Sequence, residues 1–84
     1  MIKFDHALIL DVRTGLTKNG QPYTVIRFLN LIDYMLYDGI WQFGDSAAVA
    51  AGLTVGTTCQ LGFLVIPNRN GGVSLRLESV GSAE

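Results

Sequence analysis

The chain has 84 residues, of which 49% are hydrophobic and 15% are charged, and its formal net charge is −1. These values exclude a strongly basic protein and are typical of one domain, so residues 1–84 are expected to fold as a single unit. Since no apolar run is long enough to cross a bilayer and Cys59 has no partner for an intrachain disulfide, we expect a cytoplasmic protein that contacts no membrane.

The hydrophobic share is high for so small a chain. A domain of this size buries only about 60% of the surface that its unfolded chain exposes, so a monomer would leave much apolar side chain in water. Large exposed apolar patches usually mark contact surfaces. We therefore favour self-association, with a tightly packed monomer as the alternative.

The first half of the chain predicts three strands. Apolar and polar residues alternate over Ile2–Val12, which is typical of a half-buried strand. The turn Lys18–Gly20 ends in the Asn-Gly pair favoured in hairpins. A second strand is expected at about Tyr23–Ile32, apolar on both faces, and a third at about Tyr34–Phe43. Asp38-Gly39 predicts a bulge or bend within the third strand.

The second half predicts one short helix and two more strands. Asp45–Gly52 is expected to be helical, with a polar residue capping its start and Gly52 closing it in the left-handed conformation. Strands follow at about Thr57–Ile66 and Val73–Val80, joined by the hairpin Pro67–Gly72. This order predicts an all-β fold: a five-stranded OB-fold barrel with one short helix between strands three and four. Another small barrel with the same number of strands remains an alternative.

The residues needed for catalysis do not occur in a recognisable arrangement. His6 is the only histidine, and its place among the apolar positions of the first strand favours packing over general base chemistry. Cys59 is expected to be a buried, inert thiol. The acidic residues are scattered and the glycines form no nucleotide-binding loop. We expect no enzyme activity, cofactor, metal or small-molecule substrate.

The stretch from Arg13 to Tyr23 is the most informative about function. Arg13 and Lys18 flank a glycine-containing loop, and Gln21 and Tyr23 lie where the chain enters the second strand. Cations that follow phosphates, beside a ring that stacks on a base, suit single-stranded nucleic acid. A polar hairpin with Tyr23 in the core is the alternative.

Three segments resemble a known family. The stretches TGLTKNGQPYT, AAGLTVGTTCQL and VSLRLESV are similar, in order and spacing, to the gene V family of filamentous bacteriophages. Members of that family are small helix-destabilising proteins that bind single-stranded DNA. The resemblance implies an OB-fold homodimer from a phage or mobile element. It also implies that this dimer acts in DNA replication in a bacterial host, where it coats single-stranded DNA with little sequence preference.

The resemblance also implies roles for particular residues. Arg13 and Lys18 match cationic positions of the first hairpin, Tyr23 matches a stacking tyrosine, and Arg76 matches a phosphate-binding residue of the last strand. The chain departs from the family at Gln21, where lysine is frequent. It departs also at Leu31 in place of an aromatic, at the second hairpin tip, which has Arg69 but no aromatic, and at Glu78 in place of a cation.

The remaining aromatic residues divide between the core and the surface. Tyr34 and Tyr37 are expected to contact bases, and a core position is favoured for Trp41, with stacking on bases as the alternative. Arg27 is expected to pair with Asp33 or Asp11. The predicted nucleic-acid-binding residues are Arg13, Lys18, Gln21, Tyr23, Tyr34, Tyr37, Arg69 and Arg76.

Three functions therefore remain open at this point. The leading one is a dimeric coat protein for single-stranded DNA. The second is a protein-interaction module that keeps the barrel and its apolar face but does not bind nucleic acid, which the net charge of −1 favours. The third is an RNA-binding barrel resembling cold-shock proteins, although the chain lacks their aromatic-Gly-aromatic strand motifs.

Overall fold

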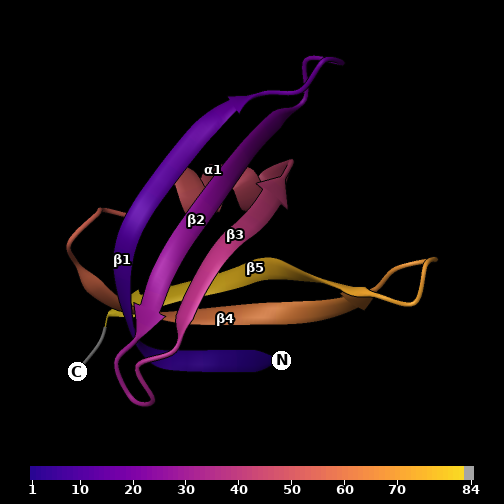
Figure 1. Cartoon of the computed structure of the whole chain (residues 1–84). Coiled ribbons are helices and arrows are strands. Elements are labelled where there is room, and N and C mark those ends of the chain that lie inside the picture. The colour runs from indigo at the N-terminus through magenta and orange to yellow at the C-terminus, as the bar shows by residue number, and fades with distance from the viewer. Residues whose placement is uncertain (83–84) are drawn as a thin grey trace.

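The computed structural model describes residues 1–82 and contains five strands and one helix (Figure 1). This confirms the all-β class and the expected order of elements. The first strand runs four residues further than Val12, into the hairpin. The elements are β1 (Ile2–Leu16), β2 (Pro22–Asn30), β3 (Leu36–Phe43), α1 (Asp45–Ala51), β4 (Thr58–Pro67) and β5 (Val73–Ser82). No helix within these residues is long and apolar enough to span a membrane.

All five strands form one antiparallel sheet in the order β3-β2-β1-β4-β5. The start of β1 pairs with β4, where Ile2 faces Phe63. The end of β1 pairs with β2, where Leu16 faces Pro22. The register of β1 shifts between Phe4 and Ala7 against β4 and between Ile9 and Asp11 against β2, and Figure 1 shows that the strand bends. The bend allows one long strand to serve both halves of the sheet.

The sheet is not closed into a barrel by backbone hydrogen bonds, so the predicted closed OB barrel is not shown. Over the described part of the chain, β3 and β5 are the two edge strands. The Gln42 side chain spans the gap between them. Its amide nitrogen donates to the Leu75 carbonyl and its amide oxygen accepts from the Leu77 N–H, both at 2.8 Å.

The core lies inside the curved sheet and is built around three rings. Phe28 stacks on Phe63 and meets Phe4 edge to face, with centroids 6.0 and 5.0 Å apart, as aromatic pairs prefer. α1 covers one end of the core with its alanines, and the buried Thr24 hydroxyl donates to the Ala47 carbonyl at 2.8 Å. The remaining buried residues of the core are Ala7, Ile9, Ile26, Ala50, Cys59, Leu61 and Leu77.

The ends of α1 differ from the sequence-based expectation. Gly44, at φ 63, precedes the helix, and no side chain caps its first amides. The Ser46 hydroxyl instead donates backwards to the Phe43 carbonyl at 2.9 Å. Gly52 has a right-handed φ of −79, so the predicted left-handed closure was wrong. The following chain leaves the helix through a turn in which the Leu53 N–H binds the Ala50 carbonyl.

The predicted irregularity in the third strand is confirmed, and it changes which side chains face the core. The register of β3 against β2 shifts beside Gly39, whose φ is +67. Before this bulge Tyr37 faces inward and stacks on Phe28 with centroids 5.1 Å apart. After it Trp41 and Phe43 face outward. Strict alternation along the strand would put these three aromatics on one face, but the bulge inserts one residue into the alternation and separates Tyr37 from the other two.

Candidate nucleic-acid interface

The outer face of β1, β2 and β3 carries two rows of side chains that cross all three strands. Residues paired across an antiparallel ladder point to the same face of the sheet. Their opposite-facing neighbours, such as Thr24 and Gln42, are buried, which leaves these rows on the outside. The two rows are Gly15–Tyr23–Phe43 and Arg13–Val25–Trp41.

Three aromatic rings on this face form a continuous surface, which we call the aromatic strip: Tyr23, Trp41 and Phe43. The Tyr23 and Trp41 centroids are 5.0 Å apart with an interplanar angle of 39°, and those of Trp41 and Phe43 are 6.2 Å apart at 16°. Trp41 is 52% exposed and Phe43 is 46% exposed. Since Tyr23 is only half-buried, all three rings offer surface to a ligand.

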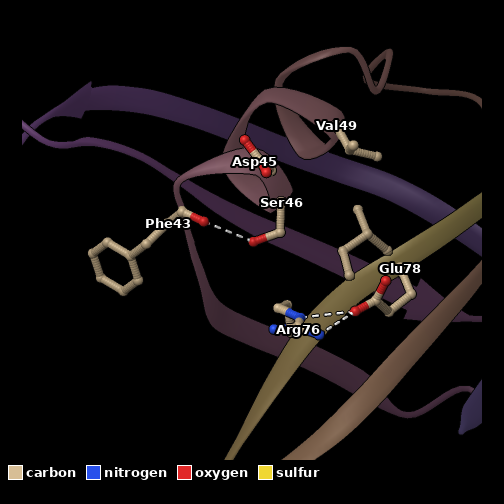
Figure 2. A pocket seen from close by; sticks show the side chains of 7 residues that line it. Phe43, Asp45, Ser46, Val49, Arg76 and Glu78 are labelled. Carbon is tan, nitrogen blue, oxygen red and sulfur yellow. Dashed lines mark hydrogen bonds and ion pairs between the residues drawn. The ribbon is translucent and has the colours of Figure 1, made fainter.

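A groove runs between the edge strands β3 and β5 beside the aromatic strip, and we call it the edge groove. It consists of two hollows, of about 420 and 330 Å³, that share Phe43, Ser46 and Arg76. Figure 2 shows the larger hollow, with the Phe43 ring at one side and Arg76 and Glu78 on the strand opposite. Arg76 therefore lies where the two hollows meet.

The arginines on these surfaces are paired with neighbouring acids. Arg13 binds Asp11 at 2.8 Å (Nε to Oδ2). Arg76 binds the Glu78 carboxylate through Nη2 at 2.6 Å and through Nε at 2.8 Å. All four side chains keep a third or more of their surface exposed, so each pair contributes only about 0.2–1 kcal/mol. Each guanidinium is therefore held only weakly by its carboxylate and stays accessible to other anions.

Arg27 is paired differently from the expectation. Its Nε lies 3.4 Å from the Asp38 carboxylate, across the β2–β3 ladder. Neither Asp33 nor Asp11 is its partner, because the Asp11 carboxylate is turned toward Arg13. Arg27 therefore forms an ion pair that joins β2 to β3.

The other predicted cations lie at the two hairpin tips. Lys18 is exposed between β1 and β2, and Arg69 is exposed between β4 and β5. Within residues 1–82 neither forms an ion pair. Gln21 is exposed at the base of the first tip, where its N–H donates to the Thr17 hydroxyl at 3.0 Å. The tips project from separate corners of the molecule (Figure 1), so the structure does not gather these cations with Arg76.

Two predicted tyrosines lie apart from the aromatic strip. Tyr34 is 74% exposed in the turn between β2 and β3, whereas Tyr23 lies at the opposite end of β2. Tyr37 packs against the core, with its ring 4.9 Å from Phe4 and 5.1 Å from Phe28. The structure thus joins Tyr23 with Trp41 and Phe43, but with neither of the other tyrosines.

Comparison with known proteins identifies no family for this chain. The sequence matches no protein-family model, and no curated protein matches it. Among residues 1–82 no group of three or more His, Cys, Asp or Glu side chains could hold a metal ion. Burial raises the pKa of the Cys59 thiol.

Sequence reasoning missed two of the three rings in the strip. Trp41 was favoured as a core residue, which its exposure contradicts, and Phe43 was not considered as a ligand contact. The signal was available, because Asp38-Gly39 predicted a bulge. Counting residues through that bulge with one position added places Trp41 and Phe43 on the face opposite to Tyr37, which is the outer face because Tyr37 packs on the core.

Proposed function

We propose that the protein binds and coats single-stranded DNA without strong sequence preference and without catalysing a reaction. The observation that carries this proposal is the aromatic strip, three partly exposed rings on one face of the sheet, in which Trp41 lies next to both Tyr23 and Phe43. A base stacked on such a ring contributes about 1–3 kcal/mol, and every base has a face that can stack. Arg13 and Arg76 at the margins of the strip supply cations for the phosphates.

We further propose that the sheet is an OB-type barrel completed by the Gln42 side chain. Proteins of that fold bind oligonucleotides on the face of strands two and three and with the loops after strands one and four. Here the strip lies on β2 and β3, and Lys18 and Arg69 occupy those two loops. The placement of rings and cations therefore agrees with an OB-type ligand path.

The proposed path places bases on the strip and the backbone along its cationic margins. Gln21 adds a neutral hydrogen-bonding side chain at the first hairpin. We expect about three to four phosphate contacts, made by Arg13, Lys18, Arg69 and Arg76. With this number of contacts, a plot of the logarithm of the binding constant against the logarithm of the salt concentration has a slope of about −2 to −3. Because three of the six cations of the chain have acidic partners, the slope is expected at the shallow end of this range.

We also propose that the coating unit is a homodimer. The turn between β2 and β3 and the first residue of β3 present apolar side chains, of which Ile32 is 63%, Met35 56% and Leu36 53% exposed. Contiguous apolar surface of this kind usually marks a contact site, and a second copy of the chain is the occupant we propose. Sedimentation of the purified protein measures this directly.

The test of nucleic-acid binding is a titration of Trp41 fluorescence with oligo(dT) at two salt concentrations. We expect quenching that saturates at low salt and weakens at higher salt. Oligo(U) in competition then distinguishes DNA from RNA as the preferred ligand. Failure of the folded protein to bind either oligomer at low salt would contradict the proposal.

A second candidate function is a protein-interaction module that does not bind nucleic acid. The observation that favours it is that Arg13, Arg27 and Arg76 already have carboxylate partners. Under this alternative, the double variant Lys18→Ala with Tyr23→Ala has the same self-association as the wild type, and neither protein binds oligo(dT). Under the leading proposal the double variant loses affinity for oligo(dT) that the wild type has.

A further inference from the structure

Gln42 has an unusual position between the two outward-facing rings of β3. Trp41 and Phe43 point to solvent, so the side chain between them points inward, where it is 1% exposed. Buried amides need partners for both of their polar atoms. Gln42 finds both on the opposite edge strand, where it donates to the Leu75 carbonyl and accepts from the Leu77 N–H at 2.8 Å.

The two backbone groups that Gln42 binds flank a single residue, Arg76. In a parallel ladder a residue binds the neighbouring strand in the same way, through the C=O and the N–H that lie on either side of one partner residue. The Gln42 amide therefore replaces one rung of a ladder between β3 and β5. It holds the backbone of Arg76 beside Trp41 and Phe43, with which Arg76 lines the edge groove.

We propose that Gln42 is a positioning residue for nucleic-acid binding. It fixes Arg76 next to the aromatic strip, so that a phosphate on Arg76 and a base on Trp41 or Phe43 belong to neighbouring positions of one strand. This inference rests on the proposed function. The amide suits the task because it presents a donor group and an acceptor atom side by side. A carboxylate would present only acceptors, and the Leu75 carbonyl would lose its donor.

The rest of β5 does not depend on Gln42. β5 pairs with β4 over its whole length, from Val73 opposite Pro67 to Ser82 opposite Cys59. Loss of the amide is therefore expected to release the β3–β5 edge while leaving the sheet intact. This makes the role testable in a folded variant.

The experiment uses Gln42→Met, which keeps the length of the side chain and removes both hydrogen bonds, together with Arg76→Ala and the double variant. Binding of oligo(dT) is measured over a series of salt concentrations. We expect Gln42→Met to lower the affinity as much as Arg76→Ala does, and to make the log-log salt slope shallower by about 0.7, the value of one phosphate contact. In the Gln42→Met background, Arg76→Ala should change nothing further.

Thr24→Val is the matched control. Thr24 is also 1% exposed and also makes one buried hydrogen bond, to the Ala47 carbonyl at 2.8 Å, but it does not touch β5. This variant should lose stability, keep the wild-type salt slope and retain the full effect of Arg76→Ala. If Gln42→Met does not fold, Gln42→Glu replaces it, since it keeps the acceptor for Leu77 and loses the donor.

The outcomes separate this role from the proposed function. A wild-type salt slope in Gln42→Met, with an undiminished effect of Arg76→Ala, would overturn the positioning role while leaving DNA binding intact. Absence of oligo(dT) binding by the wild type would overturn both. Hydrogen exchange of the Leu77 amide supplies a readout without DNA: it should accelerate in Gln42→Met and not in Thr24→Val, and unchanged protection in Gln42→Met would overturn the role.

Discussion

The ring of Tyr23 lies across Gly15, its cross-strand partner on β1. A Cβ at position 15 would come within 2.5 Å of the Tyr23 hydroxyl oxygen and 2.7 Å of ring carbon Cζ. Such distances are far inside van der Waals contact, so only glycine at position 15 permits the ring to lie there. The Tyr23 ring can therefore lie on the surface of the sheet because Gly15, opposite it on β1, has no side chain.

Gly15→Ala is therefore expected to displace the Tyr23 ring and weaken binding. Loss of one stacked base corresponds to about 1–3 kcal/mol, or roughly 5- to 150-fold in affinity for oligo(dT). The matched control is Gly81→Ala on β5, where a new Cβ meets the flexible end of Gln60 at 3.3 Å and the Gln60 Cβ at 3.7 Å, an ordinary contact distance. Equal affinity in the two variants, measured by anisotropy, would contradict the role of Tyr23.

Trp41 is expected to be the fluorescent reporter of the bound base, since it is the only tryptophan in the chain. Trp41→Ala removes the central ring of the strip and should lower the affinity for oligo(dT) by about 5- to 150-fold. Trp41→Phe retains a stacking ring and should stay close to the wild type. Similar losses in both variants would show that the indole is needed for packing against Tyr23 and Phe43 instead of for stacking on bases.

The fold was predictable where the signals are local. Alternating apolar residues marked the strands, and Asn19-Gly20 and Asn70-Gly71 marked the hairpins. The extension of β1 to Leu16 was not visible, because polar residues such as Arg13 also occur in a strand with one open face. These errors concern ends of elements, which depend on pairing with distant residues.

The site was less predictable because it depends on long-range geometry. Hairpin cations and Tyr23 were recognisable from residue type and turn position. Tyr37 was expected at the surface and Trp41 in the core, and the structure shows the reverse, because the side of β3 that faces the core depends on its pairing with β2 and its packing on Phe28. Nothing local indicates that the Gln42 amide binds residues 75 and 77, more than thirty positions away.

Glu78→Gln is expected to strengthen binding, because it releases the Arg76 guanidinium from its acidic partner. An exposed ion pair of this kind contributes about 0.2–1 kcal/mol, so the affinity for oligo(dT) should rise by up to about 5-fold, with a steeper salt slope. Asp5→Asn is the control, since Asp5 is exposed and makes no ion pair within residues 1–82. It makes the same change in net charge. An equal gain in both variants would assign the effect to overall charge alone.

Tyr34 is the one non-glycine residue within residues 1–82 with a positive φ, at 58°. A side chain in this left-handed conformation costs about 1–2 kcal/mol, which glycine avoids. Tyr34→Gly should therefore be more stable than Tyr34→Ala by about 1 kcal/mol in urea unfolding. The neighbouring Met35 has no positive φ, so Met35→Ala should be more stable than Met35→Gly. The same order at both positions would contradict the strain.

The buried Cys59 thiol is expected to make stability depend on alkaline pH. Burial raises its pKa, so above the usual thiol pKa of about 8.5 the unfolded chain loses this proton while the folded chain keeps it. The thiol's contribution to the free energy of unfolding is therefore complete below that pH and is lost as the pH rises toward the folded-state pKa. Urea unfolding under reducing conditions from pH 7 to 10 measures this against Cys59→Ala, which has no such proton. The difference in the free energy of unfolding between the two proteins should be constant below pH 8. Above pH 8 the wild type should lose stability relative to Cys59→Ala. A difference that stays constant to pH 10 would show that the thiol ionises as readily in the folded chain as in the unfolded one.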